Sequence, residues 1–212
     1  MPATLKPPAV ALLEVYSLGA ALVVLDQIEK AASVSVLQAE LNDYYGLFLK
    51  LSGDSASVRI AVETARSITS EMKVALTAKA LDAPDAEAWR VIESPREFQP
   101  LLDQDVVFFP KVPKTTMTEK SKTPEALGLL ETQGFTAVTA ATDAACKAAG
   151  VRVIAKEKLG GGYITVIFEG DVAAVTAAVA AGKAAAESVG KLISAHVIPR
   201  PSEGVGQILT RL

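Results

Sequence analysis

The chain has 212 residues, half of them apolar and 5% aromatic, and its net charge is −3 with both signs interspersed. This length suits one large domain or two small ones, and the weak, mixed charge offers no basic surface for a nucleic-acid partner. No apolar run of about 18 residues is present, so no membrane span is expected. The first residues lack the features of a signal peptide, and the single Cys146 cannot form an internal disulfide, which favours the reducing cytoplasm.

The sequence repeats itself at a distance of 117 residues. At that shift AVALLEVYSLGA (9–20) aligns with ALGLLETQGFTA (126–137), and SGDSASVRIAV (52–62) aligns with EGDVAAVTAAV (169–179). The alignment needs no gap between residues 9 and 84, and chance similarity of Ala-rich helices would not keep that register through strands and turns. The chain therefore contains two copies of one domain.

Both copies predict the same succession of strand, helix, strand, strand, helix and strand. In the first copy these elements cover 12–15, 17–32, 34–41, 46–51, 55–70 and 74–81, and in the second copy 129–132, 134–149, 151–158, 163–168, 172–188 and 192–198. Asp54 and Asp171 are placed to cap the second helix of each copy. This order predicts an α+β fold of two ferredoxin-like βαββαβ domains, each an antiparallel sheet with both helices on one face.

The domain boundaries follow from the repeat. We expect a first domain over 1–84, an extension and linker over 85–125, and a second domain with a C-terminal tail over 126–212. The stretch VPKTTMTEKSKTPE (112–125) is polar and rich in Thr, so it is expected to be exposed. The stretch before it (88–109), with Trp89 and Phe98, is expected to pack on the first domain.

The second copy resembles a bacterial microcompartment shell domain, or BMC domain. The motifs that carry the resemblance are LGLLET, EKLGGGYITVIFEGDVAAV and HVIPRP, and the first copy keeps ALLEV and SGD. Two fused copies in this order resemble the unpermuted tandem class of that family. The resemblance implies a homotrimer that forms a pseudohexameric tile with a central pore. It also implies contacts with other shell proteins, an indirect association with encapsulated enzymes, and a place in the microcompartment shell in the bacterial cytoplasm.

The resemblance places the turn between the second and third strands of each copy at the pore. The predicted pore-lining residues are Asn42, Asp43, Tyr44 and Tyr45 in the first copy and Leu159, Gly160, Gly161 and Gly162 in the second. Glycine would allow six turns to converge, and its N–H groups can bind passing metabolites. Three copies of Asp43 would disfavour anions. Alternatively, the two tyrosines pack sideways and Asp43 only makes the turn.

Three residues match the family's tile-edge positions: Lys30, Lys147 and Arg200. A lysine stem can lie along a neighbour while its ammonium donates to carbonyls, and an arginine donates through a planar fork. Ala83 stands where the first copy would carry the arginine, so three edges of each tile would bind less firmly. Alternatively, both lysines are ordinary solvated helix residues.

No set of side chains in the sequence suits catalysis, a metal or a cofactor. The glycines of 160–162 lack the GxGxxG and GxxxxGK[ST] patterns and lead into a strand. His196 is the single histidine and is expected to be packed or hydrogen-bonded, Cys146 to be a small buried apolar residue, and Glu14 and Glu131 to be structural. We therefore expect no enzyme. The alternative function is a regulatory ferredoxin-like trimer that binds a small metabolite between subunits.

Overall fold

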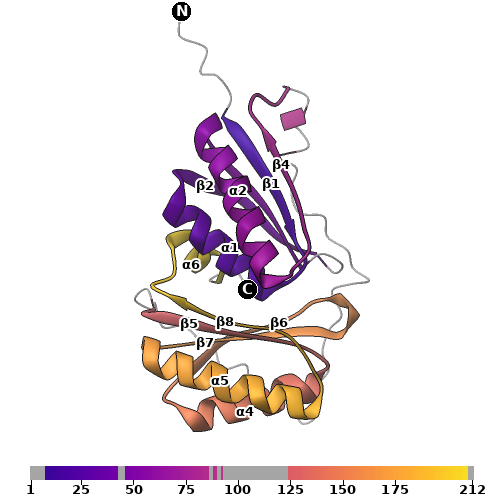
Figure 1. The fold of residues 1–212 in the computed structure, drawn as a ribbon, viewed down its shortest axis with the longest axis vertical. Coiled ribbons are helices and arrows are strands. Elements are labelled where there is room, and N and C mark those ends of the chain that lie inside the picture. Colours follow the sequence, from indigo (N-terminus) through magenta and orange to yellow (C-terminus); the bar gives the residue numbers. More distant parts are fainter. Residues whose placement is uncertain (1–7, 43–45, 86–87, 90–91, 93–123, 210–212) are drawn as a thin grey trace, which may run out of the picture.

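The computed structural model describes residues 8–42, 46–85, 88–89, 92 and 124–209. These residues form two domains, one above the other in Figure 1, each with a four-stranded antiparallel sheet. The first domain contains β1 (Ala9–Val15), α1 (Leu18–Ala31), β2 (Val34–Asn42), β3 (Gly46–Gly53), α2 (Ser55–Met72) and β4 (Leu76–Leu81). The second contains β5 (Ala126–Gln133), α4 (Phe135–Ala148), β6 (Arg152–Lys158), β7 (Tyr163–Gly170), α5 (Val172–Val189), β8 (Lys191–Pro199) and α6 (Glu203–Leu209).

The two sheets have the same topology, with strand orders β2-β3-β1-β4 and β6-β7-β5-β8. This confirms the predicted pair of βαββαβ units and the duplication behind them. Half of the strand ends extend one to three residues beyond the prediction, because the ladder pairs continue past the apolar runs, as between Ala9 and Gly53. Strands β4 and β6 begin two residues and one residue later than predicted.

Helix starts are set by local capping in three of the four long helices. Ser17, Asp54 and Asp171 each accept a hydrogen bond from a backbone N–H in the first turn of α1, α2 and α5. The two aspartates make this bond at 2.8 Å and 2.7 Å, which confirms them as N-caps. Helix α4 differs, because its N-cap is Gly134, which has no side chain to close the first turn.

The second domain has its own core between its sheet and its two helices. Phe168 on β7 is fully buried there, against β5 at Gly128. A Cβ atom at position 128 would lie 2.1 Å from the Phe168 ring, so the ring occupies the space that any larger residue would need.

The other face of the second sheet is covered by the first domain. Leu127, Leu129 and Ile198 belong to one continuous apolar cluster with Leu18 and Leu22 of α1. Figure 1 shows α1 lying over the strands β5 and β8, with α6 beside it. The two domains therefore share a core and are not joined by the connecting segment alone.

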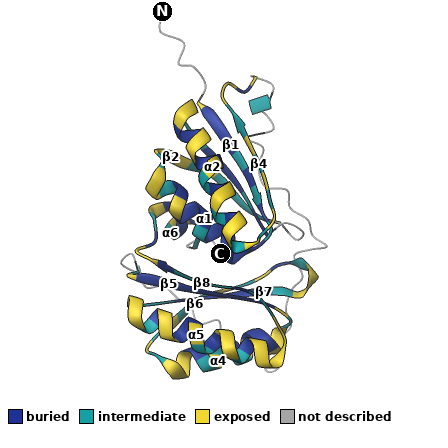
Figure 2. Ribbon diagram, viewed as in Figure 1, coloured by how far each residue is buried: buried dark blue, intermediate teal, exposed yellow. Residues whose placement is uncertain are grey.

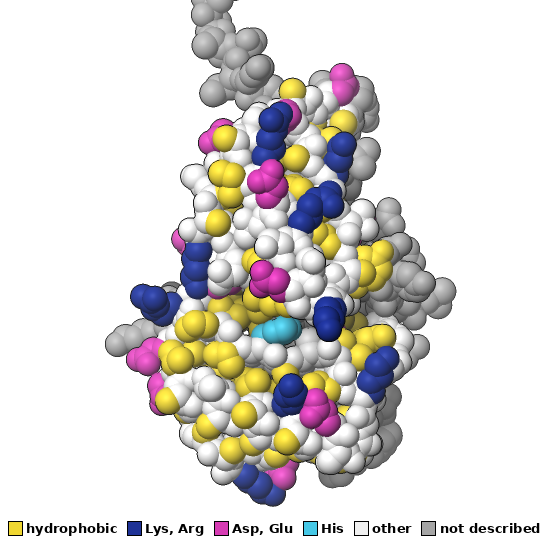
Figure 3. Space-filling model, viewed as in Figure 1, with side chains coloured by type: hydrophobic (Ala, Val, Ile, Leu, Met, Phe, Trp, Pro, Cys, Tyr) yellow, Lys and Arg dark blue, Asp and Glu magenta, His cyan; other side chains and the backbone are white. Residues whose placement is uncertain are grey.

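Helix α5 is the one described helix long and apolar enough, by length and composition, to cross a membrane, with a mean hydropathy of 1.3. Val175 and Val179 are buried, while Lys183 and Glu187 towards its C-terminus are exposed. Figures 2 and 3 show the outer surface of the second domain's helices as exposed and rich in hydrophobic side chains. A helix that packs on α4 and β5 is typical of the layer over a sheet, and the expectation that the chain spans no membrane stays a prediction.

One described part of the segment between the copies packs on the first domain. Ile92 is 6% exposed, and its carbonyl accepts a hydrogen bond of 2.9 Å from Nζ of Lys50, which is buried on β3. Trp89 is half-buried nearby in sequence. Phe98 and the polar stretch 112–123 lie outside the described residues.

Candidate functional site

The glycine turn between β6 and β7 is a single 3-10 turn that only glycine adopts readily. Gly161 and Gly162 have φ values of 68° and 81°, in the left-handed region, and both are exposed. The carbonyl of Gly162 accepts from the N–H of Gly134 at 2.8 Å, and that of Gly161 accepts from Nε2 of Gln133 at 3.2 Å. The turn is thereby fixed beside the start of α4.

Leu159, predicted together with these glycines as pore-lining, is placed differently. Its side chain is 5% exposed and lies in the apolar cluster shared by the two domains. Its N–H donates to the carbonyl of Tyr163 at 2.8 Å, which closes the hairpin. Any role of Leu159 at an opening would therefore be played by its backbone.

The corresponding turn of the first copy is described only at its ends. Asn42 ends β2 and pairs with Gly46, while Asp43, Tyr44 and Tyr45 lie outside the described residues. Gly46 has a φ of 86°, and a Cβ atom there would lie 2.6 Å from the backbone N of Ser17. This turn therefore also lies beside a helix start, that of α1. The sequence reasoning missed Gly46, although a lone glycine directly after a predicted turn was a signal for it.

A buried carboxylate joins the two domains. Glu131 of β5 is 1% exposed and accepts hydrogen bonds from Oγ of Ser17 at 2.5 Å and Oγ of Ser194 at 3.1 Å. The backbone N–H groups of Leu18 and Gly19 lie near it and favour its charged form. Burial raises the pKa of Glu131, and these hydrogen bonds oppose that rise. A side chain of the second domain thus completes the N-terminus of a helix in the first.

The C-terminal helix adds a second set of contacts between the domains. Asp26 accepts from the N–H of Ser202, and Glu29 accepts from the N–H of Gly204, each at 3.0 Å. These two carboxylates of α1 therefore satisfy backbone donors at the beginning of α6. Sequence reasoning missed them because their partners lie more than 170 residues away.

The two predicted edge lysines have different surroundings. Both form an ion pair with the aspartate one turn earlier, Lys30 with Asp26 at 2.7 Å and Lys147 with Asp143 at 2.6 Å. Lys30 also donates to the carbonyl of Pro199 in the second domain at 3.2 Å. The side chain of Lys147 is 74% exposed and is therefore the more accessible of the two.

Arg200, the third predicted edge residue, directly follows β8. It is exposed, has a φ of 49°, and donates its N–H to the carbonyl of Glu125 at 2.8 Å. The backbone at this point is thereby held in the left-handed region, with the side chain at the surface.

Cys146 was predicted to be a small buried residue, and this was wrong: it is exposed. Helix α4 packs through Ala141 and Ala145, and the next residue is turned by about 100° away from that face. His196 is half-buried beside Gly19 in the domain interface, and burial lowers the pKa of its imidazole. The described residues contain no group of three His, Cys, Asp or Glu that could hold a metal ion.

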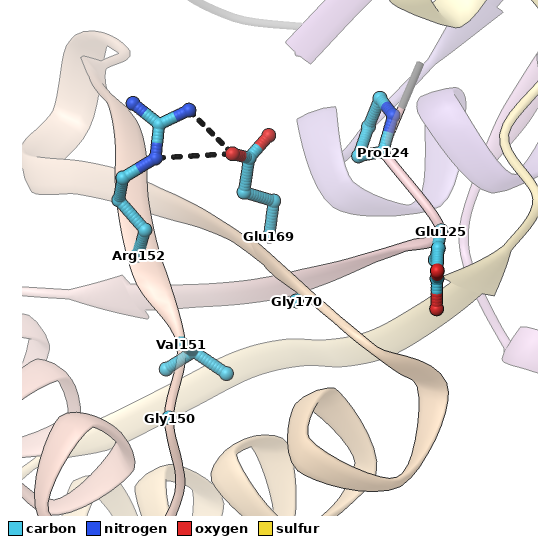
Figure 4. A pocket seen from close by; sticks show the side chains of 7 residues that line it. All are labelled: Pro124, Glu125, Gly150, Val151, Arg152, Glu169 and Gly170. Atoms are coloured by element: carbon cyan, nitrogen blue, oxygen red, sulfur yellow. Dashed lines mark hydrogen bonds and ion pairs between the residues drawn. The ribbon is translucent and has the colours of Figure 1, made fainter. Parts of the chain in front are cut away.

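A hollow of about 390 Å³ lies at the end of the second sheet opposite the glycine turn (Figure 4). It is bordered by Arg152 on β6 and Glu169 on β7, which form an ion pair. Ser35 and Ser52 occupy the matching positions of the first copy. The ion pair is therefore not repeated, and the hollow does not involve the predicted pore or edge residues.

The fold and its repeat define a protein made of two ferredoxin-like domains in one chain. The family model described as BMC domain matches residues 9–82 and 126–201. The chain belongs to the BMC domain family and carries two copies of the domain in tandem.

Curated relatives match a length of about one domain. The bacterial microcompartment shell protein PduA of Citrobacter freundii is 52% identical over 87 residues, which is 41% of this chain and 94% of that protein. EutM of Escherichia coli K12 is 52% identical over 77 residues (36% and 79%), and the carboxysome shell protein CsoS1A of Hydrogenovibrio crunogenus is 49% identical over 86 residues (40% and 90%). A crystal structure of a microcompartment protein from Desulfitobacterium hafniense covers 94% of this chain and 98% of its own, with 24% identity and a TM-score of 0.39 that is too low to bear on the fold.

Proposed function

We propose that this chain is a structural shell protein of a bacterial microcompartment, located in the shell in the bacterial cytoplasm. Its family and the shell proteins among its relatives support this role. We further propose that three chains form a pseudohexameric tile with a central pore, and that the tile contacts other shell proteins and encloses enzymes without being one.

The head-to-tail contact between the two domains is the observation that best supports a ring of three chains. Helix α1 of the first domain lies on the sheet of the second, so the contact joins two different surfaces. The counterparts of these two surfaces in the repeat are α4 and the face of β1 and β4 that carries Glu14. A repeated contact between unlike surfaces generates a closed ring when its rotation closes, and three chains would supply six domains.

The positions of the two turns support the pore. Each turn lies beside the start of the first helix of its domain, at Gly134 for α4 and at Ser17 for α1, and α1 makes the contact between the domains. In a ring of repeated contacts the two kinds of turn would alternate. Exposed backbone of Gly160–Gly162 would alternate with residues 42–45, and Asp43 would bias the opening against anionic metabolites.

We also propose that the edges of a tile differ in how readily they contact a neighbouring tile. Lys147 and Arg200 are exposed and free to reach a neighbouring tile, whereas Lys30 already donates to Pro199 of its own chain. We expect Lys147→Asp combined with Arg200→Ala to abolish extended sheets without changing the mass of a single tile.

The proposal is tested by light scattering coupled to size exclusion, followed by electron microscopy. We expect a particle of three times the 22.1 kDa chain mass that assembles into sheets or closed shells. Asp43→Ala and Tyr44→Ala should change the leakage of small anions through assembled shells. A stable monomer would rule out the tile, and discrete trimers with tight metabolite binding but no sheets would favour a regulatory protein.

A further inference from the structure

Two buried oxygen atoms beside the domain interface have no hydrogen-bond partner among the described residues. They are Oε1 of Glu131 on β5 and Oγ1 of Thr165 on β7. Glu131 is 1% exposed and Thr165 is 0% exposed, so bulk solvent does not reach either side chain. Because a buried polar atom without a partner is costly, such atoms in folded proteins are nearly always paired with protein or with ordered water.

The two oxygen atoms belong to side chains that are direct neighbours on one face of the sheet. Strand β5 lies between β7 and β8, and Glu131 pairs with Thr165 on one side and with Ser194 on the other. Directly opposed residues of antiparallel strands have Cβ atoms roughly 5 Å apart on the same face. Ser194 donates to Oε2 of Glu131 at 3.1 Å, which leaves Oε1 as the carboxyl oxygen available to the neighbour on β7.

This face of the sheet is closed by the first domain. Ile167 lies two residues beyond Thr165 and therefore on the same face, and it belongs to the apolar cluster that includes Leu18 of α1. Ser17, at the start of α1, donates to Oε2 of Glu131 from the first domain. A small molecule held between Glu131 and Thr165 is therefore enclosed by both domains.

The first copy of the domain fills the matching place with a ring. Glu14 takes the position of Glu131, and its partner on the neighbouring strand is Phe48. A phenyl ring needs no hydrogen bond, whereas threonine resembles valine with a hydroxyl in place of one methyl group. The second copy thus places a polar pair where apolar packing was available.

We infer that a single water molecule is bound between Oε1 of Glu131 and Oγ1 of Thr165, as a fixed part of the interface between the two domains. Water suits both atoms, because it can donate to a carboxylate oxygen and accept from a threonine hydroxyl or a protonated carboxyl group. Burial raises the pKa of Glu131, so a partner that serves both protonation states is needed there. This site lies within one chain and is independent of the proposed ring.

The bound water links the exchange of solvent to the opening of the domain interface. Because both domains enclose it, it can leave only when α1 separates from the sheet of the second domain. Its residence time therefore reports how often the two domains of one chain part.

Thr165→Val gives opposite results with and without the water. With the water bound, this change removes one of its partners and leaves Oε1 of Glu131 unpaired, so the urea midpoint of the full chain should fall by roughly 0.5 M. Without the water, the change removes a buried hydroxyl that has no partner, and the midpoint should stay the same or rise. A constant or raised midpoint would overturn the inference.

Crystal structures of the wild type and of two variants locate the water directly. We expect one water oxygen within about 3.2 Å of both side-chain oxygens in the wild type, kept in Thr165→Ser and lost in Thr165→Val. A direct hydrogen bond between Thr165 and Glu131, with no water between them, would overturn the inference.

Magnetic relaxation dispersion of the water oxygen nucleus gives a measurement in solution. The wild type should hold one more long-lived water than Thr165→Val. Thr132→Val is the matched control, because Thr132 is equally buried but its hydroxyl already donates to the carbonyl of Gly134 at 3.1 Å. Ser17→Ala should shorten the residence time by loosening the interface. An equal number of long-lived waters in the wild type and Thr165→Val would contradict the site, and an unchanged residence time in Ser17→Ala would contradict its enclosure by both domains.

Discussion

Replacement of Ser17 by alanine tests how strongly the two domains hold each other. The hydroxyl of Ser17 accepts from the N–H of Ala20 at 3.2 Å and donates to the buried Glu131 at 2.5 Å. Loss of an N-cap costs about 0.5–2 kcal/mol, and loss of a hydrogen bond to a charged group costs about 1.5–3 kcal/mol. Because Ser194 still donates to the same carboxylate, we expect a total of about 2–4 kcal/mol.

The assay is urea unfolding followed by far-UV circular dichroism at a fixed protein concentration, since association also adds stability. With an m-value of about 2 kcal/mol per molar, the midpoint should fall by about 1–2 M. Ser188→Ala is the control, because this exposed serine bonds only within its own helix and its loss should cost less than about 0.5 kcal/mol.

A double-mutant cycle of Ser17→Ala with Glu131→Gln should show a coupling of about 1 kcal/mol or more. If the two changes are additive, or if Ser17→Ala behaves like Ser188→Ala, the hydrogen bond between the domains contributes nothing measurable and the interface is held by its apolar contacts.

Three further changes have defined outcomes. Gly128→Ala should cost about 1–3 kcal/mol in urea unfolding because the new methyl group meets the ring of Phe168, while Gly206→Ala, with open space at its Cβ, should be neutral or slightly stabilising. Asp171→Ala should lower stability by about 1 kcal/mol through loss of the α5 cap, measured in the same way. Burial raises the pKa of Glu131, so the folded state holds this proton more tightly than the unfolded state. The contribution of Glu131 is the free energy of unfolding of the wild type minus that of Glu131→Gln. This difference should be at its full value below about pH 4.5 and should fall as the pH rises through the raised pKa. The fall should be at most about 1.4 kcal/mol per pH unit.

The order of the elements was predictable because two copies of one pattern support each other. A strand at 34–41 is weak on its own, but its duplicate at 151–158 occupies the same place in the other copy, and both are observed. The caps Asp54 and Asp171 were predictable for the same reason, since each follows a glycine at the end of a strand.

The orientation of α4 was not predictable from the sequence. Periodicity finds the buried face of a helix only when large apolar and polar residues alternate, and α4 is made largely of Ala and Thr. Cys146 therefore looked like one more small residue on a packed face, although only Ala145 beside it is buried.

The domain interface was also beyond sequence reasoning, because its partners belong to different copies. Ser17 and Glu131 lie 114 residues apart, and each has a local explanation, as a helix cap and as a strand residue. The one available signal was a mismatch in the repeat: Ser17 aligns with Gly134, which cannot make the same cap.

The cover that the second domain places on α1 limits what else can join this chain. Because Glu131 and α6 already occupy that helix, an unrelated single-domain subunit has no docking face left there. Fusion also keeps the two halves at a high effective concentration, so this joint closes before any encounter with another molecule. In a mixed assembly the chain would consequently enter as an indivisible pair of neighbours, and the number of positions left for other subunits would always be even.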